Sequence, residues 1–170
     1  MKKSQLPARF DPRPFALKGY SAAGVVPVSQ LKRIVPKLFT EEGQFSYELN
    51  FKRDRSLLSI EGTFSGDCVL ECQRCMGAMY FTTEIEIKLG IIDAEPETDN
   101  LPEGVDPLVV EDDISVQEIL EDELLLALPI VPLHEPEDCK VKMQKPVDKI
   151  EVSTKGEKSS PFDVLKTLKN

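Results

Sequence analysis

The stretch Phe45-Ser46-Tyr47-Glu48-Leu49-Asn50-Phe51 decides the fold, because large apolar residues alternate strictly with polar ones. This period of two is typical of a β-strand with one buried face. Residues 53–55 (Arg-Asp-Arg) form a predicted turn. A second alternating run then follows at Leu58, Ile60, Gly62 and Phe64. We therefore expect a β-hairpin at the centre of the protein.

Further strands are predicted downstream of this hairpin. The pair Gly-Asp at 66–67 indicates another turn, after which residues 68–70 begin a third strand. Residues 84–89 alternate again and predict a fourth strand, and residues 108–110 predict a short strand after an acidic loop. Short connections favour antiparallel pairing, since parallel strands need long crossovers.

The first 27 residues contain prolines at positions 7, 12, 14 and 27, which predicts an extended segment that exposes Arg9 and Arg13. Ser29 is positioned to cap a short helix that runs through Ile34 and is limited by Pro36.

The strongest helix prediction covers residues 115–128. Ser115 and Glu118 have the spacing of a capping box, apolar residues follow at helical intervals, and Pro129 ends the segment.

Together these elements predict an α+β fold. We expect an antiparallel sheet, open or closed into a partial barrel, with the 115–128 helix packed on it in a single domain over residues 1–139. A flexible lysine-rich linker should follow at 140–160. A short terminal helix at 161–170 would place Phe162, Leu165 and Leu168 on one side.

The net charge of −9 is unevenly distributed: residues 1–60 carry +6, residues 61–139 carry −19 and residues 140–170 carry +4. No run of eighteen apolar residues occurs, so no membrane-spanning helix is expected. The N-terminus has no apolar segment of the kind found in secretory signals. We therefore predict a cytoplasmic protein with reduced or metal-bound cysteines.

The soft metal ligands fall into two clusters. Cys72 and Cys75 form a C-x-x-C pair, while His134 and Cys139 lie about sixty residues further on. Three thiolates and one imidazole suit tetrahedral Zn²⁺, so these four residues are the candidate zinc ligands. In the alternative interpretation, the pair is simply reduced and the second cluster lies on the surface. Cys68 is most simply a small core residue.

A thioredoxin-like redox pair is a second interpretation of Cys72 and Cys75, but such pairs lie at a helix N-terminus and the flanks here predict strands. Hydrolases and transferases are disfavoured, because the sequence has one histidine and no nucleophile elbow, phosphate-binding loop or dinucleotide motif. We expect neither an enzyme nor a small-molecule substrate.

Basic residues cluster in the first third of the chain and could hold RNA phosphates, although no recognisable RNA-binding signature is present. The candidates are Arg9, Arg13, Lys32, Arg33, Lys37, Lys52, Arg53, Arg55 and Arg74.

The sequence resembles the YceD family in several stretches. They are Glu71-Cys72-Gln73-Arg74-Cys75, the run from Glu121 through Pro129 to His134, Cys139, and the ending from Pro161 to Lys169. The opening Leu6-Pro7 and Asp11-Pro12 are also similar. The resemblance implies a bacterial factor required for synthesis, processing or accumulation of 23S ribosomal RNA, without a known catalytic activity. Many members carry a richer C-terminal cysteine cluster, from which this sequence departs.

Two non-enzymatic roles follow from this resemblance. The protein could bind precursor 23S RNA through its basic residues. Alternatively it could be an adaptor for large-subunit assembly proteins, with acidic residues 93–123 meeting a basic ribosomal protein and Phe162 and Leu165 contacting a partner.

Overall fold

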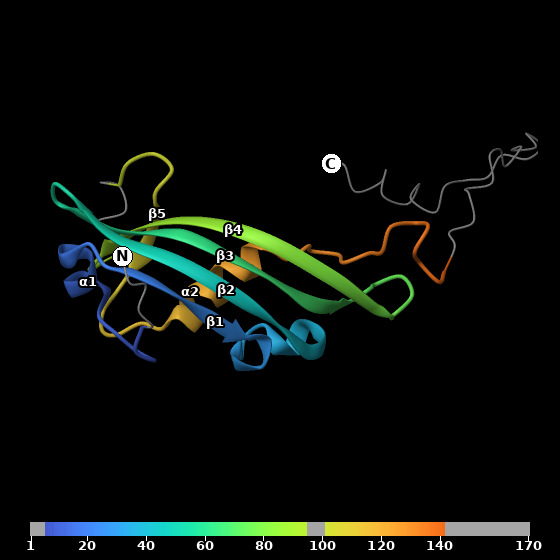
Figure 1. Ribbon diagram of the computed structural model, residues 1–170. Coiled ribbons are helices and arrows are strands. Elements are labelled where there is room, and N and C mark those ends of the chain that lie inside the picture. The colour runs from blue at the N-terminus through green and yellow to red at the C-terminus, as the bar shows by residue number, and fades with distance from the viewer. Residues whose placement is uncertain (1–5, 95–100, 142–170) are drawn as a thin grey trace, which may run out of the picture.

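The computed structural model describes residues 6–94 and 101–141, and its elements follow one another in a simple order (Figure 1). They are helix α1 (Pro12–Lys18), strand β1 (Ser21–Pro27), the 3₁₀ turns η1 (Val28–Gln30) and η2 (Val35–Lys37), strands β2 (Leu38–Asp54), β3 (Leu57–Glu71), β4 (Ala78–Ile92) and β5 (Asp106–Val109), and helix α2 (Val116–Ala127).

The strands form one sheet in the order β1-β2-β3-β4-β5. The first four strands pair antiparallel as a meander, which confirms the expected pairing. Strand β5 pairs parallel to β4, so the sheet is mixed and the prediction of a purely antiparallel sheet was wrong. The sheet is an open, curved surface and does not close into a partial barrel (Figure 1).

The central hairpin has the predicted alternation, since all four large residues of the opening stretch are buried beneath the sheet. The predicted turn is also present, and Arg55 adopts a positive φ of 53° there. The predicted turn at 66–67 was wrong, because β3 continues through it. A Cβ atom at Gly66 would lie 2.2 Å from the Gln44 carbonyl oxygen, so this glycine marks a close approach of two backbones.

The N-terminal segment contains helix α1, so the extended conformation predicted for residues 1–27 was wrong at this point. Asp11 caps the helix by accepting a hydrogen bond from the Arg13 N–H, and Gly19 ends it at φ 63°. Pro12 occupies the first helical turn, where its missing N–H has no acceptor to lose. The helix predicted after Ser29 was also wrong, since the 3₁₀ turns η1 and η2 replace it.

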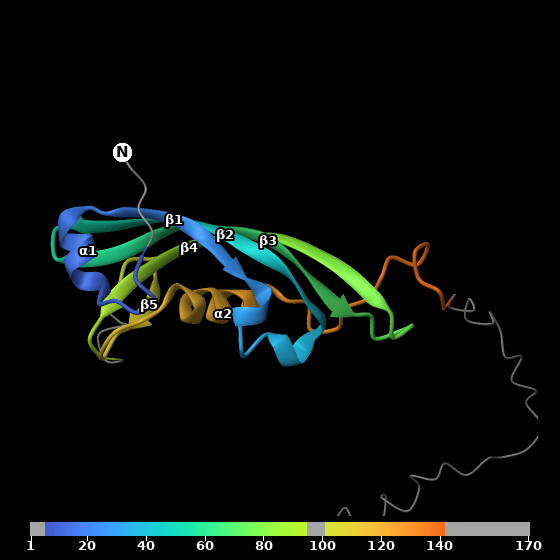
Figure 2. The ribbon, with the colours of Figure 1, turned by 60° about the horizontal axis from the view of Figure 1, so that its bottom comes forward.

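Helix α2 lies against the concave face of the sheet (Figure 2), and its capping box between Ser115 and Glu118 is present as predicted. Its buried side chains join those of the sheet in one core; they include Ile119, Leu120 and Leu124. Glu121 is also buried and accepts a hydrogen bond of 2.8 Å from the Arg33 backbone N–H.

The long sheet has two different ends. At one end, α1 covers the β2–β3 hairpin, and at the other end the β3–β4 hairpin extends beyond α2 in both views (Figures 1 and 2). Within residues 6–94 and 101–141, no helix is long and apolar enough to span a membrane. The predicted linker and terminal helix at 140–160 and 161–170 lie almost entirely outside the described residues.

Candidate metal centre

The turn between β3 and β4 presents the first pair of cysteines. The Cys72 N–H donates to the Gly77 carbonyl at 2.9 Å, and the Met76 N–H donates back to the Cys72 carbonyl at 2.8 Å. Met76 completes the turn with a positive φ of 54°. The backbone therefore folds into a tight knuckle that places Cys72 and Cys75 side by side.

The segment after α2 returns to this knuckle. The Gln73 N–H donates to the Pro132 carbonyl at 2.9 Å, which fixes the connector beside the turn. Two residues later the His134 N–H donates to the Cys72 sulfur at 3.5 Å. A turn follows in which the Cys139 N–H donates to the Glu135 carbonyl at 3.1 Å, so the chain folds back and buries Cys139.

These contacts bring together all four predicted metal ligands: one donor atom each from Cys72, Cys75, His134 and Cys139 lies within 4.8 Å of the others. Cys75 Sγ lies 3.4 Å from His134 Nδ1. Zinc–sulfur bonds of about 2.3 Å in a tetrahedron place ligand atoms roughly 3.8 Å apart. The donor set therefore fits Zn²⁺ with side-chain shifts of about 1 Å or less.

The histidine is oriented as a metal ligand would be. His134 Nε2 lies 2.8 Å from the Ala78 carbonyl oxygen, an acceptor that requires the proton to be on Nε2. Nδ1, which faces the thiols, then carries the lone pair. Metal-bound histidines commonly donate their second ring N–H in this way, which fixes both the tautomer and the ring orientation.

The local environment distinguishes the thiol of Cys72 from that of Cys68. Burial raises the pKa of Cys72, but the N–H groups of His134, Cys75 and Arg74 outweigh this and lower the pKa to about 6. Burial in the core raises the pKa of Cys68 to about 11. Thiolates are the form that binds metal, so Cys72 is prepared for this role and Cys68 is an inert core residue as predicted.

The knuckle argues against the redox interpretation of the pair. Cys72 and Cys75 lie between two strands, whereas thioredoxin-like pairs gain their low thiol pKa from a helix N-terminus.

Four of the predicted RNA-binding residues are paired with the protein's own acids. Arg9 contacts Glu118 at 2.7 Å, and the remaining pairs are Arg13 with Asp11 and Asp93, Arg33 with Asp122, and Lys52 with Glu61. Arg13 was predicted to be exposed, but its side chain is only 28% accessible. These cations are therefore less available to phosphates than the sequence suggested.

The other basic candidates form no ion pair within the described part of the chain, and all of them except Lys32 lie toward one of the two ends of the sheet. Arg53 and Arg55 lie at the β2–β3 hairpin, and the Arg53 Nε donates to the Arg55 carbonyl at 3.0 Å. Lys37 and Arg74 lie near the knuckle, while Lys32 follows η1. Phe162 and Leu165 are outside the described residues.

Sequence reasoning missed an apolar groove beside the knuckle, lined by residues from η2, β2, β3 and the segment after α2. Each contributing stretch is too short to show a pattern alone. The available signal was the proline-punctuated apolar run from Pro129 to Leu133, which is too short and irregular to predict a groove.

Comparisons with known proteins agree with these motifs. The family model described as large ribosomal RNA subunit accumulation protein YceD matches residues 60–169. A Haemophilus influenzae protein with that same name is 32% identical over 172 residues, which cover 99% of both chains. No solved structure matches. The match spans the knuckle, α2 and the second ligand cluster, and the chain therefore belongs to the YceD family of large ribosomal RNA subunit accumulation proteins.

Proposed function

We propose that this protein supports accumulation of large-subunit (23S) ribosomal RNA in the cytoplasm as a non-enzymatic binding factor whose knuckle is held by one structural Zn²⁺ ion. The observation that carries the metal proposal is the convergence of Cys72, Cys75, His134 and Cys139. The family relationship supports the role in RNA accumulation.

A non-catalytic role is consistent with this donor set. Four protein ligands close the tetrahedron around zinc, whereas catalytic zinc sites keep one position for water or substrate. The only histidine of the chain would be a ligand, and so it would not serve as a general base.

Metal analysis of protein purified without chelator tests the site. We expect one zinc per chain, lost in Cys72→Ser and in His134→Ala, and retained in Cys68→Ala, because Cys68 lies outside the cluster. Zinc-free wild-type protein would refute the metal site and leave the family role unaffected.

Direct RNA contact would depend on the basic residues without acidic partners. Arg53 and Arg55 are exposed at the hairpin, next to the ion-paired Lys52. If they bind phosphates, affinity for a transcript of large-subunit RNA should fall steeply with salt. Replacing both arginines by alanine should reduce the salt slope by about 1 to 2, while the matched variant Lys52→Ala should change it less. Binding that does not depend on salt would exclude this contact.

The open face of the sheet favours a second candidate, an adaptor that binds a basic assembly protein. Paired residues share one face of a sheet, and the outer rows here are rich in carboxylates. The rows are Glu48–Thr63–Glu86, Ser46–Ser65–Glu84 and Asn50–Glu61–Lys88. Such a surface would repel RNA and attract cationic protein segments.

Charge reversal separates the two candidates. The double variant Glu84→Lys/Glu86→Lys should abolish capture of purified basic large-subunit proteins if the sheet face binds them. The double variant Glu111→Lys/Asp112→Lys changes two exposed acids of the segment 93–123 and tests that segment as the alternative acidic surface. Undiminished capture by both variants would argue against the adaptor.

A further inference from the structure

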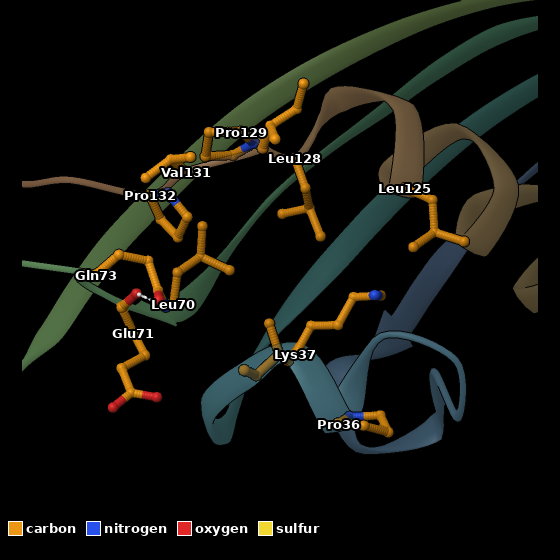
Figure 3. Close-up of a pocket in the computed structure, with 12 residues that line it drawn as sticks. Pro36, Lys37, Leu70, Glu71, Gln73, Leu125, Leu128, Pro129, Val131 and Pro132 are labelled. Carbon is orange, nitrogen blue, oxygen red and sulfur yellow. Dashed lines mark hydrogen bonds between the residues drawn. The ribbon is translucent and has the colours of Figure 1, made fainter. Parts of the chain in front are cut away.

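A groove of about 560 Å³, lined by both apolar and polar side chains, adjoins the knuckle. Leu70 of β3 and Leu128 after α2 point into it from opposite sides, and Leu125 of α2 lies beside them (Figure 3). The Lys37 side chain extends from η2 in the direction of Leu125, and Pro132 lies near Gln73 at the other side of the groove (Figure 3). The groove is thus built from four separate parts of the chain.

Parts of the groove wall are exposed in a way that is unusual for aliphatic residues. Ile130 is fully exposed and Val131 is 56% exposed, and both line the groove. Contiguous apolar surface of this kind commonly marks a binding site. Its rim carries one cation, Lys37, and one anion, Glu71; within residues 6–94 and 101–141, neither forms an ion pair.

The chain itself contains a segment that matches this groove. Residues 161–169 have the sequence Pro-Phe-Asp-Val-Leu-Lys-Thr-Leu-Lys, in which Phe162, Leu165 and Leu168 recur at helical spacing. Asp163 and Lys166 flank that apolar side, with charges opposite to those of Lys37 and Glu71 respectively.

The position where the described chain ends makes this match reachable. Cys139 belongs to the same cluster as Cys72, and Gln73, which follows Cys72 in the sequence, lines the groove and donates a hydrogen bond to the Pro132 carbonyl. About twenty residues separate Cys139 from Pro161, and a chain of that length can extend for up to about 70 Å, which is more than enough to return to the groove. Such a tether gives an effective concentration of about 1 mM. An intrinsic Kd as weak as about 0.1 mM would then keep the segment docked about tenfold more often than free.

We propose that the groove between η2, β3 and the segment 125–132 binds the apolar side of residues 161–169 of the same chain. Phe162 and Leu165 would lie against Leu128 and Val131, above the buried Leu70. Docking would cover the exposed aliphatic residues, with Asp163 beside Lys37 and Lys166 beside Glu71. This inference is independent of the proposed role in RNA accumulation.

The absence of tryptophan from the sequence provides a sensitive test. Phe162→Trp introduces a single fluorophore in the full-length protein. We expect blue-shifted emission and weak quenching by acrylamide at every protein concentration. Adding Val131→Asp should shift the emission to that of exposed tryptophan, since a charge in the groove wall opposes burial of an indole.

The matched control is Leu126→Asp, also in the Phe162→Trp background. Leu126 is 83% exposed and lies outside the groove, so this variant adds the same charge nearby without changing the site. Val131 is already exposed, so Val131→Asp should not disturb the fold, which circular dichroism can verify.

Three outcomes would overturn the proposal. The first is solvent-exposed emission in the Phe162→Trp protein, which would leave the groove to an external partner. The second is a blue shift that Val131→Asp and Leu126→Asp affect equally. The third is a blue shift that disappears on dilution, which would show that a second copy supplies the segment.

Discussion

The two ends of the sheet are held by different chemistry. At the end covered by α1, four aromatic rings pack together, with the Phe15 and Tyr20 centroids 5.0 Å apart and the Phe10 and Phe51 centroids 5.8 Å apart. At the other end, the β3–β4 hairpin extends past α2, and Met76 and Tyr80 are exposed at 59% and 81%. There three thiols and one imidazole meet instead.

This difference follows from what covers each end. Aromatic side chains stabilise a sheet where a second layer buries them, and α1 supplies that layer. Beyond Leu70, where the pairing of β2 with β3 ends, the hairpin is two-stranded and lies past α2, and a two-stranded hairpin alone is at best marginally stable in water. A metal cross-link between the knuckle and the segment after α2 would replace the missing apolar packing.

Removing the metal should give the largest effect, confined to the knuckle. Structural zinc can contribute on the order of 10 kcal/mol to local folding. After treatment with a strong chelator, hydrogen exchange measured by mass spectrometry should accelerate at Gln73 and Met76, whose amides are bonded in the knuckle. The Phe51 amide at the aromatic end should keep its protection. If hydrogen exchange accelerated equally at both ends after metal removal, the two ends would unfold together and not independently.

Phe51→Ala tests the opposite end. Phe51 is 1% exposed and contacts three other rings, so truncation should lower the free energy of unfolding by about 3–5 kcal/mol. Chemical denaturation measures this loss, and zinc content should remain unchanged. Loss of zinc together with the aromatic packing in Phe51→Ala would contradict the view that the two ends of the sheet are stabilised independently.

The sequence allowed prediction of the elements whose signal is local. Burial of one face imposes the alternation from Phe45 to Phe51, and capping imposes the spacing of Ser115 and Glu118, so both could be read directly. The clustering of Cys72, Cys75, His134 and Cys139 could be predicted because the chain has few soft donors. The helix over Pro12–Lys18 was missed although Asp11-Pro12 is a capping signature, because proline was treated only as a helix breaker.

Features that depend on distant parts of the chain could not be predicted. Gly43 adopts φ +115° at a bulge in β2, and a Cβ atom there would lie 2.3 Å from the Asp67 carbonyl oxygen, yet the sequence around it gives no register. The pairing of Arg9 with Glu118 joins residues 109 positions apart. Charge counts alone therefore overestimated the basic surface.

Two glutamates on α2, which lies between the two ends, should respond in opposite ways to substitution by glutamine. Burial, with Asp106 and Asp122 nearby, raises the pKa of Glu123 in the folded protein. A raised pKa means that protonated Glu123 stabilises the fold at low pH, and this stability is lost as pH rises through the folded pKa. Glu123→Gln should therefore stabilise at pH 7, by less than about 1 kcal/mol, and the gain should vanish below about pH 4.

The control for this prediction is Glu121→Gln. The buried Glu121 carboxylate accepts the Arg33 N–H, so its replacement weakens a charge-assisted hydrogen bond and should destabilise the protein at pH 7. Thermal unfolding of both variants should be measured from about pH 3 to about pH 8, a range that spans the ordinary carboxyl pKa of about 4.3. Opposite changes in stability at neutral pH would distinguish the two variants. Destabilisation by both substitutions at neutral pH would contradict the burial argument for Glu123.

Arg9→Ala should cause the smallest loss in the free energy of unfolding. It tests how much ion pairs contribute to stability near the aromatic end. The hydrogen bond from Arg9 lowers the pKa of Glu118, but the two side chains are 56% and 48% exposed. The pair should therefore contribute only about 0.5 kcal/mol. A lowered carboxyl pKa gives stability that is present above the unfolded value of about 4.3 and is lost as pH falls through the folded pKa.

The loss of stability caused by Arg9→Ala should accordingly become smaller below about pH 4 and at high salt. Thermal unfolding can measure this change. Arg55→Ala is the matched control, because Arg55 has no acidic partner within residues 6–94 and 101–141. A deficit that persisted at low pH and high salt would mean that Arg9 acts through its hydrogen bond to the Asp113 carbonyl or through packing beside Phe10, and not through the Glu118 charge. That result would strengthen the contrast between the ends, since the α1 end would then depend on uncharged contacts and the knuckle on its four candidate ligands.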